Sequence, residues 1–304
     1  MTSRKSPLVS IVLPTYNGAR YLRQSIDSCL NQSYKNVELV IVDDGSSDET
    51  PQIIKSYSDS RIKYIRCTKN NGLPNALNIG FANSTGAYLT WTSNDNEYIP
   101  TAIEEMLTYL RKNKNLDVVY ADCWLRDLDT NGMELHVMPE ITYPALENQV
   151  GACFLYTRRV YETVGYYNPK YRLVEDYDYW IRVTKQFKTG HYSKALYYYG
   201  VHSESLTKTK PFSIMLLAQI LRYKYGFISL FKMSEFTYKS NMPGDIIPYL
   251  KSVISVSTRS FEFCTLCSIS LFRVFVQALP KYLRRFLSLP FIFFLKLDKI
   301  GGAG

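Results

Sequence analysis

The sequence predicts a doubly wound α/β sheet flanked by helices, and three observations support this fold class. Over residues 1–120, short apolar runs alternate with segments whose apolar residues recur at helical spacing. The run over residues 37–42 is rich in Val and Ile, which is typical of a strand buried on both faces of a parallel sheet. That run ends abruptly in two adjacent carboxylates, Asp43 and Asp44, followed by Gly45.

The two carboxylates after residues 37–42 mark a candidate ligand site. Gly45 breaks the strand, and Pro51 stands where a helix should begin after a cap by Asp48 or Thr50. Asp43 and Asp44 are therefore expected at the carboxyl end of a central strand, where open α/β sheets bind ligands. The alternative is that they only cap the next helix, although a cap needs one acidic residue and not two.

Each remaining element follows from its local pattern. An apolar strand over residues 8–13 is stopped by Pro14, and a turn over residues 15–18 leads into a helix over 21–30. The elements expected next are strand 37–42, a helix around 53–57, strand 62–65, helix 73–81, strand 87–91, a helix opened by a capping box over 101–104, and strand 117–120. Beyond residue 120, tyrosine-rich segments predict helix 158–164 closed by Gly165, helix 175–187 and strand 196–199, which extend the same sheet.

Composition favours a cytosolic protein with a sizeable core. The chain has 304 residues, of which 46% are hydrophobic. Its six cysteines are scattered except for Cys264 and Cys267, which lie in an apolar stretch with no second pair nearby, so we expect reduced packing residues and neither a zinc nor a redox site. The first seven residues lack the long apolar segment of a signal peptide.

Positive charge gathers in the last third of the chain. Of the formal net charge of +9, residues 211–304 hold 12 Lys+Arg against 4 Asp+Glu, a balance of +8, and residues 1–210 hold 24 against 23, a balance of +1. We therefore expect two regions: a domain over 1–210, with halves 1–120 and 121–210, and a basic amphipathic helical tail over 211–304.

The tail has the composition of helices that lie in a membrane surface. The runs 263–272 and 286–297 are strongly apolar, yet each is shorter than the ~20 residues that a spanning helix needs. Basic residues flank both runs, as is typical of helices near lipid phosphates. The alternative is that these are core helices of a small second lobe.

The sequence lacks two common nucleotide-binding motifs, and it has an acidic loop after strand 87–91. The sequence has neither a Gly-x-Gly-x-x-Gly after its first strand nor a phosphate-binding loop, so a bound nucleotide would be held by carboxylates and a cation. Asp95 follows strand 87–91 and should reach the same sheet edge as Asp43 and Asp44, where oxygen ligands suit Mg²⁺ or Mn²⁺. The alternative is a polar turn that caps the next helix.

A third acidic group opens the helix predicted over 175–187. Glu175, Asp176 and Asp178 lie within four residues, and a helix N-terminus favours negative charge in any case. Trp180 and neighbouring tyrosines would also form a stacking wall that binds a sugar and tunes a carboxylate base.

Four motifs in order resemble the family-two glycosyltransferases. They are Ser10-Ile-Val-Leu-Pro-Thr-Tyr-Asn17-Gly, Val40-Ile-Val-Asp-Asp-Gly-Ser-Ser-Asp-Glu-Thr50, Gly86-Ala-Tyr-Leu-Thr-Trp-Thr-Ser-Asn-Asp-Asn96, and Glu175-Asp176. The resemblance covers roughly residues 7–209. It implies the GT-A fold, a mixed sheet flanked by helices, and an inverting enzyme that uses a nucleotide-sugar donor.

The resemblance also implies roles for individual residues. Asp176 would be the general base, Asp95 and His202 would hold Mn²⁺ or Mg²⁺, and Glu175, Asp178 and Trp180 would lie on the acceptor side. The residues that would bind the nucleotide sugar are Pro14, Thr15, Tyr16, Asn17, Asp43, Asp44 and Asn94.

The chain departs from the family pattern at three places. Its Asp-x-Asp position reads Ser93-Asn94-Asp95, Leu77 stands where an Arg often precedes Asn78, and Gly200 stands where an Arg often precedes the late His202. The resemblance thus supports two hypotheses: an active enzyme, or a catalytically weak member that acts as a nucleotide- or glycan-binding module.

We expect this protein to transfer one sugar, and we compare that function with nucleotidyl transfer and with nucleic-acid binding. The tail lacks long channel-forming spans, so we expect single-sugar transfer from a UDP-sugar to a glycan or lipid-linked acceptor in cell-surface polysaccharide synthesis, by a protein peripheral to the cytoplasmic face of the membrane. A sugar nucleotidyltransferase would usually carry a glycine-rich phosphate loop near the first strand. Nucleic acid is not an expected partner, because the positive charge lies among apolar segments.

Overall fold

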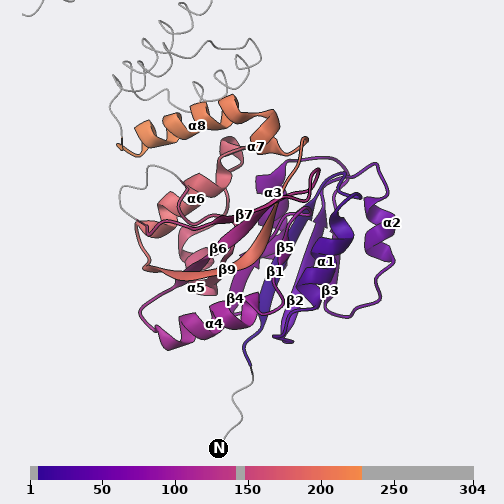
Figure 1. The fold of residues 1–304 in the computed structure, drawn as a ribbon, viewed down its shortest axis with the longest axis horizontal. Helices are drawn as coiled ribbons and strands as arrows, with labels where there is room; N and C mark the ends of the chain where they lie inside the picture. Colours follow the sequence, from indigo (N-terminus) through magenta and orange to yellow (C-terminus); the bar gives the residue numbers. More distant parts are fainter. Residues whose placement is uncertain (1–5, 142–147, 228–304) are drawn as a thin grey trace, which may run out of the picture. The chain divides into compact units, whose positions relative to one another are not determined.

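The computed structural model describes residues 6–141 and 148–227 (Figure 1). Residues up to 218 belong to one compact unit, and a second unit begins at Gln219. The elements in chain order are β1 (Val9–Thr15), α1 (Leu22–Leu30), β2 (Val37–Asp43), α2 (Thr50–Lys55), β3 (Ile62–Arg66), α3 (Leu73–Ala82), β4 (Tyr88–Trp91), β5 (Glu97–Tyr98), α4 (Ala102–Lys112), β6 (Val118–Asp127), β7 (Met133–His136), β8 (Phe154–Thr157), α5 (Arg158–Val164), the 3₁₀ helix η1 (Pro169–Tyr171), α6 (Glu175–Thr184), β9 (Thr189–Val201), α7 (Leu206–Thr209) and α8 (Pro211–Lys224).

The strands form one mixed sheet. Its order is β3-β2-β1-β4-β8-β6-β9-β5, with β7 paired to β6. The first four of these strands are parallel, whereas β8 runs antiparallel to both β4 and β6. The α/β fold class with a mixed sheet is therefore confirmed, with the parallel, doubly wound part confined to the first half of the chain.

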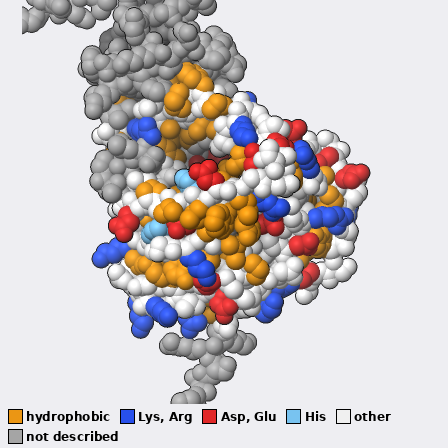
Figure 2. Space-filling view, in the orientation of Figure 1, with side chains coloured by type: hydrophobic (Ala, Val, Ile, Leu, Met, Phe, Trp, Pro, Cys, Tyr) orange, Lys and Arg blue, Asp and Glu red, His pale blue; other side chains and the backbone are white. Residues whose placement is uncertain are grey.

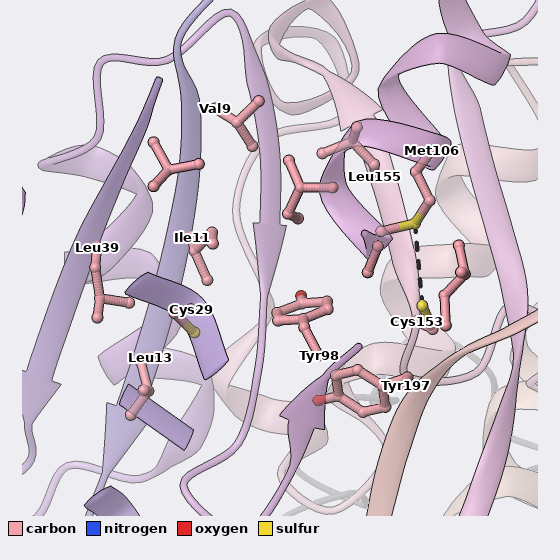
Figure 3. Packing of buried hydrophobic residues seen from close by; sticks show 14 of the residues in the cluster. Val9, Ile11, Leu13, Cys29, Leu39, Tyr98, Met106, Cys153, Leu155 and Tyr197 are labelled. Atoms are coloured by element: carbon pink, nitrogen blue, oxygen red, sulfur yellow. Dashed lines mark hydrogen bonds between the residues drawn. The ribbon is translucent and has the colours of Figure 1, made fainter. Parts of the chain in front are cut away.

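Alternation along the strands builds a core on each face of the sheet. Val9, Ile11 and Leu13 of β1 point to one face and Val12 to the other, because successive side chains of a strand alternate. The first cluster joins the sheet to α1, α2 and α4; part of it is drawn in Figure 3, where Cys153 Sγ lies 4.0 Å from Met106 Sδ. The second cluster joins the sheet to α3, α5 and α6. The result is a layer of helices on each side of the sheet.

Most predicted elements of the first half form within two residues of their expected bounds, and the differences have local causes. β1 continues through Pro14 to Thr15, although we expected Pro14 to stop it. Pro14 pairs with Val42 of β2, whereas the register with β4 ends at Val12, so the missing N–H leaves no ladder bond unmade. The predicted capping box at residues 101–104 is wrong, because the Thr101 hydroxyl donates to Glu105 Oε1 (2.6 Å) and caps no backbone N–H.

The second half departs further from the prediction. β9 is 13 residues long where four were expected, and α6 ends at Thr184. The short strands β5, β7 and β8 were not predicted at all. Helix α5, closed by Gly165 at φ +81°, is confirmed.

No helix within residues 6–141 and 148–227 is long and apolar enough to cross a membrane. The two apolar runs of the tail and the proposed membrane-surface helices lie outside the described residues. The predicted boundary at residue 210 stays a prediction.

A glycine on α3 allows that helix to approach the sheet closely. A Cβ built on Gly80 would lie 2.3 Å from Val12 Cγ1 and 3.3 Å from Val42 Cγ2, and both valines are fully buried. Gly-to-Ala changes inside helices usually stabilise by about 1 kcal/mol through propensity. Here the added methyl has no room, so overpacking opposes that gain.

We therefore expect Gly80→Ala to lower the free energy of unfolding by about 1–2 kcal/mol, measured by urea denaturation. The matched control is Gly132→Ala, where the nearest atom to the added Cβ is Thr130 Oγ1 at 3.4 Å; it should stay within about 0.5 kcal/mol of the parent. In a Val12→Ala background the same Gly80→Ala change should cost less. A stabilising effect of Gly80→Ala alone would contradict the close approach.

Candidate active site

Three parallel strands bring their carboxyl ends to one edge of the sheet. In register, Thr15 at the end of β1 pairs with Asp43 at the end of β2, and Val12 pairs with Trp91 at the end of β4. The loops that follow these strands, residues 16–21, 44–49 and 92–96, therefore begin side by side (Figure 1). The predicted donor residues lie on these loops and on the strand ends beneath them.

Hydrogen bonds join the loop after β1 to the loop after β2 and to the first residue of α2. The N–H groups of Asn17, Gly18 and Ala19 donate to Ser46 Oγ (2.9 Å), Thr50 Oγ1 (2.9 Å) and Asp48 Oδ2 (3.1 Å), and Ser47 N–H donates back to Asn17 Oδ1 (2.9 Å). In making these hydrogen bonds, Asn17 adopts a left-handed backbone conformation with φ +49°.

The side chains of Thr15 and Tyr16, which precede the hydrogen-bonded residues 17–19, have different surroundings. The Tyr16 ring is 47% exposed above the fixed backbone, which leaves it free to stack on a ligand. The Thr15 hydroxyl is buried and has no hydrogen-bond partner among the described residues.

Asp43 is buried in a network of its own. Its Oδ1 accepts from Ser46 N–H (2.8 Å), its Oδ2 accepts from the Tyr64 hydroxyl (3.0 Å), and Arg66 Nε lies 3.4 Å from Oδ2. Burial, and then this bond to Asp43, raise the pKa of Tyr64 to about 12. The network fixes the carboxylate without using all four of its lone pairs.

Asp44 holds a second loop in place. Its carboxylate accepts from the N–H groups of Asn71 (2.9 Å) and Gly72 (2.7 Å), immediately before α3. The loop then crosses Gly45 so closely that a Cβ there would lie 2.7 Å from the Lys69 carbonyl carbon, and Gly45 has φ +80°. The contacts of Asp44 are therefore those of a residue that supports a loop.

Asp95 and His202 meet beside these loops. Asp95 Oδ2 lies 3.2 Å from His202 Nε2, and the exposed fractions of the two side chains are 22% and 11%. Burial raises the pKa of Asp95, an effect that the His202 contact opposes. The His202 ring packs on Tyr21 with 5.1 Å between centroids, and its buried Nδ1 has no partner among the described residues.

Two glycines set the position of the Asp95 turn. A Cβ on Gly18 would lie 1.9 Å from Asn94 Nδ2, so Asn94 packs directly on the first donor loop. On the other side, a Cβ on Gly200 would lie 2.2 Å from the Asp95 carbonyl oxygen, and Gly200 N–H donates to Asn96 Oδ1 (2.8 Å). The glycine that replaces the family's arginine at this position thus has a structural reason.

The candidate base Asp176 lies in the first turn of α6. Its Oδ2 accepts from Asn148 Nδ2 (2.8 Å) and its Oδ1 from Tyr177 N–H (2.7 Å). Burial raises the pKa of Asp176, and these hydrogen bonds act in the opposite direction. The residue that leads into this helix, Leu173, has φ +81°, an uncommon conformation for a side-chain-bearing residue and one that clusters at functional sites.

Tyr199 on β9 connects Asp176 to the sheet edge. Burial raises its pKa to about 12, and the carboxylates of Asp95 and Asp176 both contribute to that rise. A direct geometric link runs through Tyr167, whose hydroxyl accepts from Trp91 Nε1 (3.0 Å) at the end of β4 and whose ring stacks on Tyr179 of α6 with 4.2 Å between centroids. The structure therefore brings the residues after β4 and the start of α6 into one site.

Arg172 makes a second connection. Its side chain lies over Gly72, where an added Cβ would be 3.6 Å from Arg172 Nε, and its charge acts on Glu175. Arg172 thus joins the loop held by Asp44 to the residues that precede α6.

All three residues predicted on the acceptor side, Glu175, Asp178 and Trp180, are buried. Trp180 is 3% exposed and packs edge-on against Phe154 with 4.7 Å between centroids. Asp178 is 1% exposed and accepts from Arg182 Nε (3.0 Å). Trp180 therefore packs in the core and does not form the predicted stacking wall, and Asp178, paired with Arg182, also fixes α6 against the sheet.

Three residues of this site were missed in the sequence. Asn148 donates a hydrogen bond to Asp176, Arg172 lies against Gly72 and acts on Glu175, and both Asp95 and Asp176 contribute to the raised pKa of Tyr199. Asn148 and Arg172 stand in segments without periodicity, so no pattern marked them. Tyr199 belongs to a predicted strand, but Tyr197 and Tyr198 precede it directly, and the sequence does not indicate which of the three tyrosines lies at the site.

Asp95 and His202 are suited to bind a divalent cation that is also coordinated by the substrate. Within the described ranges no three His, Cys, Asp or Glu side chains gather to form a complete protein site. Asp95 offers a carboxylate and His202 an imidazole, and Mg²⁺-type sites often use one or two carboxylates with phosphate oxygens and water. This pair is therefore suited to a cation held jointly with a diphosphate.

Comparisons with known proteins agree with this geometry. "Uncharacterized glycosyltransferase RP339" of Rickettsia prowazekii is 38% identical over 189 residues, which are 58% of this chain and 58% of that protein. "Putative glycosyltransferase EpsE" of Bacillus subtilis is 30% identical over 229 residues, 72% of this chain and 81% of its own length. The matched region thus spans little more than half of the first relative.

Solved structures share the fold. S. aureus TarS 1–349 superposes with a TM-score of 0.58 at 17% identity, covering 90% of this chain and 81% of that one, and its complex with UDP-GlcNAc gives a TM-score of 0.56. The GT-A fold expected from the motifs is thereby confirmed. The family model described as "Glycosyl transferase family 2" matches residues 10–179, more than half of the chain, and the chain therefore belongs to glycosyltransferase family 2.

Proposed function

We propose that this glycosyltransferase moves one sugar from a UDP-sugar to a hydroxyl group of a glycan or lipid-linked acceptor, with inversion at the anomeric carbon. The arrangement that supports this most is the pair Asp95 and His202, with 3.2 Å between Oδ2 and Nε2, together with the candidate base Asp176 in the first turn of α6, since a donor edge and a carboxylate base must share one site for transfer to occur. UDP is favoured because the solved structures of S. aureus TarS with the same fold include complexes with UDP and UDP-GlcNAc.

In the proposed reaction, Asp176 accepts the proton of the acceptor hydroxyl. The hydroxyl oxygen then attacks the anomeric carbon from the face opposite the nucleoside diphosphate, forming the new C–O bond as the diphosphate leaves with the electron pair of the old one. Asn148 and Tyr177 N–H hold the carboxylate in one orientation. Burial raises its pKa, which makes it a better base, and positioned base catalysis of this kind contributes about 10²–10⁴-fold.

The donor would lie along the sheet edge. Tyr16, which is exposed, is suited to cover the nucleoside base, with Asp43 below it and the clamped backbone of residues 17–19 beside it. Asp95 and His202 would hold Mn²⁺ or Mg²⁺ against the diphosphate. A bound cation would neutralise the charge that develops on this leaving group.

The acceptor and the location follow from the sequence alone. The basic, apolar tail favours an acceptor at the cytoplasmic face of a membrane, with the protein bound peripherally. The proposal therefore places the reaction in the synthesis of cell-surface polysaccharide.

The role of Asp176 predicts a separation of turnover from binding. We expect Asp176→Asn to lower turnover of the donor by about 10²–10⁴-fold, because the amide cannot accept the proton. Donor affinity, measured by calorimetry, should change less than about threefold. The matched control is Asp59→Asn, which removes a carboxylate that bonds Arg61 at the opposite end of the sheet and should leave turnover unchanged. Turnover within tenfold of the parent in Asp176→Asn would exclude this residue as the base.

The cation proposal predicts a metal-dependent donor preference. Purified protein is screened against UDP-, GDP- and dTDP-sugars for binding and slow hydrolysis, with Mn²⁺ or with EDTA. One donor should be hydrolysed only with Mn²⁺, and Asp95→Asn should remove most of the Mn²⁺-dependent gain in donor affinity. Equal hydrolysis in EDTA would contradict the cation site. Binding of a donor without turnover on any acceptor would instead support a nucleotide-binding module.

A further inference from the structure

The carboxyl group of Glu175 is buried in an arrangement that does not suit a negative charge. Glu175 is the first residue of α6 and is 6% exposed. Its Oε2 is enclosed and has no hydrogen-bond partner among residues 6–141 and 148–227. The carboxyl group does accept backbone hydrogen bonds from the N–H groups of Leu173 and Glu175, which favour the charged form, but burial and the neighbouring Asp176 outweigh them. A buried carboxylate oxygen without a donor disfavours the ionised form and favours protonation.

Asp176, the next residue, differs from Glu175 in that neither of its carboxylate oxygens is left without a donor. Both oxygens of Asp176 accept hydrogen bonds, from Asn148 Nδ2 and from Tyr177 N–H. Two adjacent carboxylates, of which Glu175 is buried and Asp176 is partly buried, repel one another when both are ionised, so the pair keeps one proton over a wide pH range. The oxygen without a donor is the better place for that proton.

The remaining charges around the pair do not reverse this preference. Arg172 is the cation that acts on Glu175, yet it is exposed to water, and its effect is smaller than those of burial and of Asp176. On the elements packed against α6, Arg159 of α5 is paired with Asp117 and Lys170 of η1 is exposed. The phenols that Asp176 faces, Tyr167 and Tyr199, are neutral at physiological pH, because burial raises the pKa of both.

We propose that Glu175 is held as a neutral carboxylic acid and that Asp176 beside it carries the negative charge. Glu175 is then a positioning residue that acts through Asp176, an assignment that rests on the proposed function for its catalytic meaning but not for its protonation. The neutral acid leaves one charge at the start of α6. A second charge there would repel a donor that itself carries a negatively charged diphosphate.

The direction of the titration follows from the same contacts. Burial, and then the charge of Asp176, raise the pKa of Glu175 to about 8. An unfolded chain has a Glu pKa of about 4.3, so the stability contributed by this group is complete below that pH and is lost as the pH rises through about 8.

The first test reads the proton directly and needs no activity. Side-chain carboxyl signals of the full chain are followed by ¹³C NMR from pH 4 to 10. One Glu signal should titrate near pH 8, should be absent in Glu175→Gln, and should persist in the control Glu162→Gln, which removes an exposed glutamate of α5. Titration of every Glu signal below pH 6 would overturn the proposal.

The second test reads the consequence for turnover. The parent should lose donor turnover above pH 8, whereas Glu175→Gln, which preserves a neutral side chain of the same shape, should lack that alkaline decline. A loss at pH 7 as large as that of Asp176→Asn would overturn the proposal, because it would require an ionised Glu175. If Asp176→Asn itself keeps turnover, the proposed function fails, while the NMR titration still decides where the proton lies.

Discussion

The site depends on the burial of two adjacent carboxylates at the end of β2. A buried carboxylate must find hydrogen-bond donors, and here most of the donors are backbone N–H groups of the loops around it. Asp43 thereby fixes the turn at Ser46, and Asp44 fixes the loop at Asn71 and Gly72. The turn at Ser46 then holds the loop after β1, so one dipeptide organises three loops along the edge where a donor would bind.

The second half of the site is built differently. Asp176 is positioned by the first turn of a helix whose buried residues, Asp178 and Trp180, fix it against the sheet. Asn78 joins this region to α3 through reciprocal hydrogen bonds with the backbone of Tyr167, both of 2.8 Å. The hydrogen bonds of Asn78 and the aromatic packing of α6 therefore set where the candidate base lies relative to the donor edge.

Elements that are encoded by neighbouring residues could be predicted from the sequence, whereas those that depend on distant contacts could not. β1 to β4 and their helices were predictable because each apolar run is buried by its own periodicity, and Asp43, Asp44 and Asp95 follow from their places at strand ends. β5, β7 and β8 span only two to four residues and exist through pairing with distant strands, which no local pattern encodes. Trp180 was misread because an aromatic next to a carboxylate looks the same whether it faces a ligand or the core, and Asn148 becomes significant only once the fold brings it to Asp176.

The close contact between Gly200 and the Asp95 carbonyl also limits how this enzyme can evolve. Any side chain at position 200 meets that carbonyl before it can reach a ligand, so an arginine there becomes tolerable only after the turn over residues 93–96 has changed. The same substitution is thus acceptable or harmful according to the order in which mutations arise. Gly200 and the turn over residues 93–96 are therefore coupled, so a side chain at position 200 requires a change in that turn.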